Sequence, residues 1–163
     1  MTNLILIDMD GVVSDFDWHM LTEYGKLLSE MTNKEQNRFW DSECVSRRFF
    51  ANSPAIIEGI QLVNKIEEAG IEMAFLTSTG GQLQHIDIAK QKLDFLQKNG
   101  LGHLPVIFAT GTKCKASFAK PGTILVDDRD KVVDAFRIRS GIALLFTRDN
   151  WLSVFEAINK QPN

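Results

Sequence analysis

A short apolar run that leads into two aspartates constrains this chain more than any other feature. Residues 4–7 are all Leu or Ile, and Asp8, Asp10 and Gly11 follow within four positions. Four apolar residues are too few for a buried helix and are typical of a strand buried on both faces. Ligands of open α/β sheets bind beyond the carboxyl ends of the strands. We therefore expect Asp8 and Asp10 to bind Mg²⁺, or to act as a nucleophile beside an acid and base. A plain Asp-Gly turn is the alternative.

Four further apolar segments predict strands, and helical periodicity separates them along the chain. The strand segments are 71–76, 106–109, 123–126 and 142–146, and the helical ones are 56–69, 82–99, 131–139 and 151–159. Within 82–99 the apolar residues at the helical period are Leu83, Ile86, Leu93 and Leu96. This alternation predicts right-handed crossovers and an α/β fold whose mostly parallel, five-stranded sheet is covered on both faces.

Residues 17–55 break the alternation, because they contain no clear strand. Helices are predicted over 18–30 and 34–50, between the first strand and its crossover helix. An insert at this point projects over the carboxyl end of the first strand, so we interpret 17–55 as a small helical cap on a core of 1–16 and 56–163. Four aromatic residues favour a lid over simple padding of the sheet: Phe39, Trp40, Phe49 and Phe50.

Polar residues also follow the second and fourth predicted strands. Thr77, Ser78 and Thr79 precede a glycine pair, an arrangement that offers hydroxyl and backbone donors to a phosphate. Asp127 and Asp128 follow the fourth strand, where two adjacent acids are costly unless a cation or donors compensate them. In both places, capping of the next helix is the alternative.

A lysine between these segments is expected to offset the acidic charge. Lys113 and Lys115 are the candidates, and a solvated basic loop is the alternative for either one. We favour Lys115, because it opens the turn that leads into the fourth strand.

Composition limits the remaining possibilities. The chain of 163 residues, with a net charge of −3, fits one globular domain and gives no strong signal of a nucleic-acid partner. The N-terminal apolar run is too short for a signal peptide or a membrane span. Two distant cysteines predict a reducing, cytoplasmic setting, and three isolated histidines make a transition-metal site improbable. The sequence gives no signal of the oligomeric state.

The order Asp-x-Asp, Thr/Ser, Lys and Asp-Asp resembles the haloacid dehalogenase (HAD) superfamily of phosphatases over nearly the whole chain. Within it, the segments 8–16, 75–78 and 124–129 are similar to motifs of the 5′(3′)-deoxyribonucleotidases. The resemblance implies a HAD-like Rossmannoid three-layer fold with a cap inserted after strand one. It also implies a Mg²⁺-dependent phosphomonoester hydrolase that works through an aspartyl-phosphate intermediate.

The resemblance implies a role for each motif residue. Asp8 is the nucleophile, and Asp10 protonates the leaving oxygen and then activates water. Mg²⁺ is held by the Asp8 carboxylate, the Asp10 backbone carbonyl and Asp127, with Asp128 orienting the ligands. Thr77 holds phosphoryl oxygens and Lys115 cancels charge, as phosphoryl transfer requires. Further substrate contacts are expected from Ser78, Thr79, Trp40 and Arg47.

A nucleoside monophosphate is the expected substrate, because an aromatic cap suits a ring-bearing phosphomonoester. Another small phosphorylated metabolite, or the 3′-phosphate of a polynucleotide, is the alternative, and Arg47 and Arg48 support the latter only weakly. A receiver domain combines similar residues, but its acidic pair comes early in the chain, whereas here the pair comes last. A non-catalytic Mg²⁺-binding module is a third reading, against which the intact Asp8 and Asp10 argue.

Overall fold

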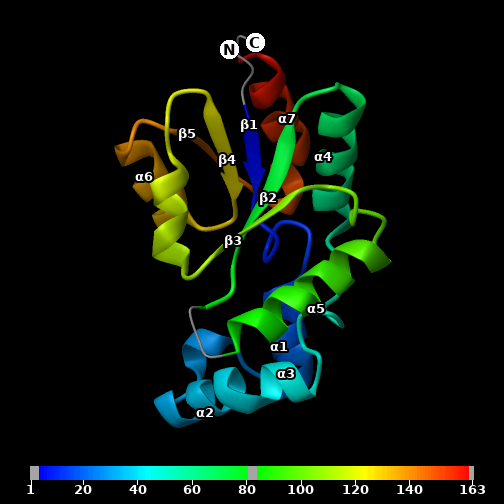
Figure 1. Cartoon of the computed structure of the whole chain (residues 1–163), viewed down its shortest axis with the longest axis vertical. Coiled ribbons are helices and arrows are strands. Elements are labelled where there is room, and N and C mark those ends of the chain that lie inside the picture. The colour runs from blue at the N-terminus through cyan, green and yellow to red at the C-terminus, as the bar shows by residue number, and fades with distance from the viewer. Residues whose placement is uncertain (1–3, 81–83, 162–163) are drawn as a thin grey trace.

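Five parallel strands form one sheet in the order β3-β2-β1-β4-β5 in the computed structural model, which describes residues 4–80 and 84–161 (Figure 1). The strands are β1 (Leu4–Ile7), β2 (Met73–Ser78), β3 (Val106–Ala109), β4 (Thr123–Asp127) and β5 (Ile142–Leu145). The chain runs outward from β1 to β3, then returns to the other side of β1 with β4. The order of strands thus reverses beside β1, and the crevice at such a reversal is where α/β proteins bind ligands.

Seven α-helices and four segments of 3₁₀- or π-helix complete the described chain. The helices are α1 (Phe16–Tyr24), α2 (Asn33–Arg38), α3 (Cys44–Ser46), α4 (Ile57–Glu68), α5 (His85–Lys98), α6 (Asp130–Ile138) and α7 (Trp151–Asn159). The four segments are η1 (Leu28–Glu30), the π-helical η2 (Phe39–Glu43), η3 (Thr112–Phe118) and η4 (Arg148–Asn150). None of the helices in 4–80 and 84–161 has the length and apolar character needed to cross a membrane.

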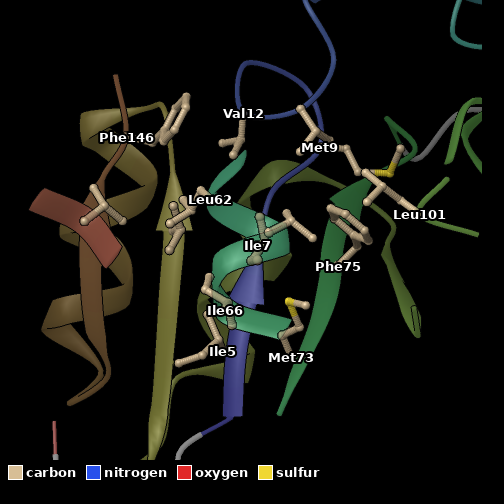
Figure 2. Close-up of a cluster of buried hydrophobic side chains, with 14 of the residues drawn as sticks. Ile5, Ile7, Met9, Val12, Leu62, Ile66, Met73, Phe75, Leu101 and Phe146 are labelled. Atoms are coloured by element: carbon tan, nitrogen blue, oxygen red, sulfur yellow. The ribbon is translucent and has the colours of Figure 1, made fainter. Parts of the chain in front are cut away.

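Successive side chains of the central strand β1 point to opposite faces of the sheet, so the molecule has two hydrophobic cores, one on each face. Ile5 and Ile7 join one cluster with side chains of α4, α5 and α7, and Figure 2 shows them beside Met73 and Phe75 of β2. Leu6 faces the other cluster, which α6 covers. The fold therefore has three layers, and the predicted five-stranded parallel sheet is confirmed.

The loop after β1 packs closely against α4. A Cβ atom on Gly59 of α4 would lie 1.7 Å from the carbonyl oxygen of Val12, so glycine is the residue that allows this approach. Val12 is itself fully buried, and Figure 2 shows it above Leu62. The backbone that follows Asp8 and Asp10 is consequently held by the core.

The insert between β1 and α4 forms a helical layer at one end of the molecule, where α1, α2 and α3 gather (Figure 1). Its core contains aromatic, methionine and cysteine side chains, together with one residue of α5: Phe16, Met20, Met31, Phe39, Cys44, Phe49, Phe50 and Ile88. The two connections to the core lie side by side, because Ser14 and Ala55 form an antiparallel bridge. The Asp15 backbone N–H also donates to the Pro54 carbonyl at 2.8 Å.

Helix α5 binds the cap from the other side. The Gln91 side chain accepts a hydrogen bond from the Phe50 backbone N–H at 3.1 Å, and Arg48 pairs with Asp94 at 2.7 Å. The Gln84 amide donates to the Asp41 carbonyl at 3.0 Å. The cap therefore rests on α5 as well as on its own two connections. The division between core and cap remains a prediction.

Several predicted boundaries were wrong. Strand β2 begins at Met73, two residues late, and the helix expected over 18–30 ends at Tyr24 because Gly25 takes a left-handed φ of 69°. The helical run expected over 34–50 ends at Ser46, ahead of Arg48 with its φ of 50°.

The predicted apolar face of α5 was also wrong in part. Ile86 and Leu93 are 58% and 45% exposed, and the buried face instead contains Ile88, Gln91, Lys92, Phe95 and Leu96. Gln82 and Leu83, at the start of the predicted helix, lie outside the described residues, as does Gly81.

Candidate active site

Asp8 and Asp127 lie side by side at the ends of β1 and β4, with the Lys115 ammonium between them. Strand register sets the pair, since Ile7 aligns with Val126 and each aspartate is the next residue. Lys115 Nζ, from η3, lies 2.6 Å from Asp8 Oδ2 and 2.8 Å from Asp127 Oδ2. All three side chains are almost completely buried. The structure thus brings the predicted nucleophile, metal ligand and lysine together.

The electrostatics of this triad favour a charged lysine. Burial lowers the pKa of Lys115, but Asp8 and Asp127 raise it by more, so the net direction is upward. Burial, followed by the charge of Asp8, raises the pKa of Asp127 to about 7 even though Lys115 lowers it. Both pKa values are raised, which favours the charged form of Lys115 but the neutral form of Asp127. The reason is that one ammonium serves two carboxylates: Lys115 faces two opposite charges, whereas Asp127 also faces the like charge of Asp8.

Asp128 completes an acidic cluster that suits a divalent cation. One carboxylate oxygen from each of Asp8, Asp127 and Asp128 lies within 4.8 Å of the other two. Burial, and then the charges of Asp8 and Asp127, raise the pKa of Asp128 to about 7. Its buried Oδ1 has no hydrogen-bond partner in the described structure. Hard oxygen donors and an unsatisfied buried carboxylate are what Mg²⁺ requires, so the residues fit this ion.

Gly11 is needed where Asp128 approaches the loop after β1. Its φ is 84°, and a Cβ atom there would lie 2.1 Å from Asp128 Oδ2. The sequence suggested only an Asp-Gly turn at this position. The structure adds a steric reason for glycine. It also places a carboxylate oxygen of Asp128 in the same cluster as those of Asp8 and Asp127, although the resemblance gives Asp128 only an orienting role.

A second buried lysine holds Asp10 and Thr77. Lys92 Nζ, from α5, donates to Asp10 Oδ2 at 2.5 Å and to Thr77 Oγ1 at 2.7 Å. The side chain of Lys92 is 1% exposed. The second oxygen of Asp10, Oδ1, is buried without a hydrogen-bond partner in the described structure. This oxygen therefore has unused hydrogen-bonding capacity beside the pocket that Asp10 lines.

A pocket of about 110 Å³ opens above these groups, between the sheet and the cap. Its floor includes Asp8, Asp10 and Lys115, and its cap side is largely apolar: Phe16, Leu28, Trp40 and Phe50. The remaining lining residues are Ser78, Gly80, Thr112 and Arg129. Charged groups at one end and rings at the other suit an anionic ligand with an apolar or planar remainder.

Not every predicted substrate contact reaches this pocket. Ser78 and Trp40 line it, but the Thr79 hydroxyl turns away and donates to the Ala109 carbonyl at 3.4 Å. Arg47 lies over the Tyr24 ring, 5.3 Å from the centroid, and lines a different hollow of the cap. For Thr79 and Arg47, the structure does not support the expected contact.

Burial distinguishes the two candidate lysines, Lys113 and Lys115. Lys113 is exposed, whereas Lys115 is buried against Asp8 and Asp127. Position therefore favours Lys115 over Lys113.

Sequence reasoning missed Lys92 and the apolar lining residues Phe16 and Leu28. A signal for Lys92 was present, because it follows Ile88 by four residues and precedes Phe95 by three, on the buried face of α5. A lysine in an apolar stripe has to find a partner when it is buried. Phe16 and Leu28 gave no comparable signal, because contacts across the cap decide where they point.

No model of a known protein family matches the sequence, and no curated protein matches it. Solved structures do resemble it. A HAD-superfamily hydrolase from Ehrlichia chaffeensis superimposes with a TM-score of 0.57 at 11% identity, covering 98% of both chains. A HAD-like hydrolase from Burkholderia xenovorans gives 0.54 at 12% identity, covering 100% of this chain and 90% of the other.

A third similar structure carries a more specific description. D,D-heptose 1,7-bisphosphate phosphatase from Burkholderia thailandensis gives a TM-score of 0.51 at 13% identity, covering 94% of this chain and 85% of the other. Identities this low support a statement about architecture only. The order of the strands and these superpositions together show that the chain has the fold of the HAD-superfamily hydrolases.

Proposed function

We propose that this chain is a Mg²⁺-dependent phosphomonoester hydrolase. One observation carries the proposal: Asp8, Lys115 and two further carboxylates converge at the end of the central strand, where Asp8 and Lys115 line the floor of a pocket. A carboxylate that attacks a phosphate anion needs nearby positive charge to overcome repulsion. Lys115 supplies one such charge and lines the pocket. The fold supports the same class of chemistry.

The proposed reaction has two steps that exchange bonds at phosphorus. In the first, an Asp8 carboxylate oxygen forms a bond to phosphorus, the ester P–O bond breaks, and Asp10 gives its proton to the leaving oxygen. In the second, Asp10 takes a proton from water, whose oxygen attacks phosphorus, and the bond to Asp8 breaks. Inorganic phosphate and the free enzyme result.

Mg²⁺ would be held by Asp8, Asp127 and Asp128, and by the Asp10 backbone carbonyl that the resemblance adds. When bound, it withdraws charge from the phosphoryl oxygens and fixes their position. Lys115 then remains as a second cation beside the nucleophile. The resemblance assigns a phosphoryl oxygen to Thr77, but the Thr77 hydroxyl is buried and accepts a hydrogen bond from Lys92. Ser78 lines the pocket and is the better placed of the two hydroxyls to hold that oxygen.

A nucleoside monophosphate, as in the 5′(3′)-deoxyribonucleotidases, is the substrate that the pocket favours. Phe50 is stacked within 25° of both Phe16 and Trp40, with centroid distances of 5.9 and 6.2 Å, and all three rings line the pocket. A planar base could lie against such rings. A polynucleotide end is less well supported, because Arg47 and Arg48 pair with Glu23 and Asp94 at 3.6 and 2.7 Å.

A panel of phosphorylated compounds tests the proposal. Purified protein should hydrolyse p-nitrophenyl phosphate with Mg²⁺ and lose this activity in EDTA. Deoxynucleoside monophosphates should give a higher kcat/KM than sugar phosphates or a 3′-phosphorylated oligonucleotide. Release of phosphate from no compound would reject the enzyme assignment and favour a non-catalytic module. Preference for a sugar phosphate would reject only the nucleotidase assignment.

A further inference from the structure

One ring of the cap lies over the buried ammonium group that binds Asp10 and Thr77. Lys92 Nζ is 5.0 Å from the centroid of Phe50, a distance typical of a cation–π contact. Phe50 belongs to the cap and is 3% exposed, whereas Lys92 belongs to α5. The cap therefore covers Lys92 and the two hydrogen bonds that it makes.

Lys92 uses its donors within the protein. Two go to Asp10 Oδ2 and Thr77 Oγ1, and the Phe50 ring faces the same ammonium. Lys115 lines the pocket, but Lys92 is not among the residues that do. A ligand in the pocket therefore meets Asp10, and Lys92 acts on the ligand only through its partners.

The effect of Lys92 on Asp10 is directional. By occupying Oδ2, Lys92 leaves the unpartnered Oδ1 as the oxygen that can exchange a proton with a leaving group. Asp10 lines the pocket and its Oδ1 is buried, so the rotation of the carboxylate that Lys92 holds decides whether Oδ1 can reach a leaving group. A hydrogen bond that is shielded from water holds such a rotation more firmly than an exposed one.

We propose that the cap takes part in the chemical step through Phe50, which shields Lys92 and thereby fixes the carboxylate of Asp10 and the hydroxyl of Thr77. Lys92 and Phe50 are positioning residues in this scheme. The inference rests on the proposed phosphatase function and adds to it, because a cap that only selected substrates would leave the hydrolysis of a minimal substrate unchanged.

Turnover of p-nitrophenyl phosphate by paired variants tests the proposal. Lys92→Met should lower kcat by about 100-fold, the scale of lost acid–base catalysis, with KM changed less than about threefold. Phe50→Leu should lower kcat by about tenfold through loss of the ring contact, again with little change in KM.

Two control variants make the same kinds of substitution at residues outside the contact between Lys92 and Phe50. Lys90→Met changes an exposed lysine of α5. Phe49→Leu changes the neighbouring ring of the cap core, which stacks on His19 and meets Phe50 edge to face at 5.7 Å, whereas the ring that faces Lys92 is Phe50. Both should keep kcat within about twofold of the wild type, measured well below the melting temperature. If Phe49→Leu and Phe50→Leu lose kcat equally, the proposal is wrong, because general loosening of the cap then explains both.

The double variant Phe50→Leu/Lys92→Met gives a further criterion. If Phe50 acts through Lys92, the double variant should be no slower than Lys92→Met alone. Losses that multiply would show independent roles and overturn the proposal. Lys92→Gln replaces Lys92→Met throughout if the methionine variant does not fold.

Denaturation separates failure of this inference from failure of the proposed function. The shifts of the urea midpoint for Phe50→Leu and Lys92→Met should be non-additive, whereas those for Phe50→Leu and Lys90→Met, at an exposed lysine of α5, should add. If the wild type hydrolyses no phosphomonoester, the function is rejected, and non-additivity still supports the Phe50–Lys92 contact. Additive shifts in the first pair would reject that contact whether or not the protein is an enzyme.

Discussion

At the scale of single residues, two lysines divide four carboxylates between them. Lys115 binds Asp8 and Asp127, Lys92 binds Asp10, and Asp128 has no ammonium partner among the described residues. With all of these groups ionised, two negative charges remain. A single divalent cation balances them, and a bound phosphate dianion would then meet a nearly neutral floor.

Asp8→Asn should abolish phosphatase activity without unfolding the protein. An amide is a poor nucleophile, so kcat should fall by at least about 1,000-fold. Stability should not fall, because removing the charge of Asp8 relieves its repulsion of Asp127. Steady-state kinetics and thermal melting measure the two effects, with Asp134→Asn on the exposed surface of α6 as the matched control. Wild-type turnover by Asp8→Asn would reject the assignment of Asp8 as the nucleophile.

Lys115→Met and Lys113→Met should differ sharply. Removing the buried ammonium leaves Asp8 and Asp127 facing each other, which costs about 3–5 kcal/mol in typical buried pairs. We expect a loss of activity of more than about 100-fold and a lower melting temperature for Lys115→Met, part of which Mg²⁺ restores. Lys113 is exposed, so its variant should match the wild type in both assays. The reverse result would identify Lys113, and not Lys115, as the catalytic lysine.

At the scale of elements, the cap divides its aromatic residues between two tasks. Phe39 is fully buried in the cap core, whereas the adjacent Trp40 lines the pocket and lies near Gly80, where a Cβ atom would be 3.3 Å from the indole. The sequence could suggest that one of the two contacts substrate. The structure favours Trp40, because it shares the pocket with Asp8.

Trp40→Ala should raise KM for the best nucleotide substrate by about tenfold, since a stacked ring contributes roughly 1–3 kcal/mol to the binding of a base. Hydrolysis of p-nitrophenyl phosphate should change by less than about twofold, because the ion pairs of Lys92 and Lys115 do not involve Trp40. Phe50, on which Trp40 stacks, also packs against Phe16 and Phe49 and should keep its place over Lys92. Both substrates are assayed on protein that melts at the wild-type temperature. An equal loss on both substrates, or a large drop in melting temperature, would show Trp40 to be structural.

Helix α5 shows why a periodic pattern can be assigned to the wrong face. Its exposed Ile86 and Leu93 and its buried Lys92 run against a simple rule of apolar residues inside. The rule fails here because α5 contacts the cap, the catalytic floor and the sheet on successive turns, so polar partners are available inside. Propensity finds the helix, and tertiary contacts decide which residues it buries.

At the scale of the whole molecule, the acidic cluster links stability to pH and to Mg²⁺. The folded pKa values of Asp127 and Asp128 are about 7, above their ordinary value of 3.8. Between those limits the folded state binds more protons than the unfolded state, so these groups lower the free energy of unfolding as pH rises from about 4 to about 7. Above about pH 7 both are ionised, and Mg²⁺ binds without displacing protons.

Melting with and without Mg²⁺ should therefore depend on pH. The rise in melting temperature on adding Mg²⁺ should be larger near pH 8 than near pH 5.5, by about 3 °C or more. Asp128→Asn removes one of the two titrating carboxylates and should shrink that difference. A rise in melting temperature on adding Mg²⁺ that does not depend on pH would contradict binding of the ion at the cluster of Asp8, Asp127 and Asp128.

Much of this architecture could be predicted, because strongly apolar strands and the acids after them are local signals. β1 and β3 have their predicted boundaries, and Asp8, Asp127 and Lys115 meet as expected. Long-range contacts produced the differences. The turning of Thr79 toward β3, the pairing of Arg47 with Glu23, and the burial of Lys92 each depend on a partner distant in the chain or on the packing around it.

The dependence of the cap on α5 also bears on how the chain folds as it is synthesised. Residues of the cap emerge from the ribosome well before Ile88 and Gln91, which fill its core and bind its backbone. Until α5 is made, several cap rings have no complete cluster to enter. Early intermediates of this chain should therefore expose aromatic surface, and truncation before residue 98 should leave a species prone to aggregation or in need of a chaperone.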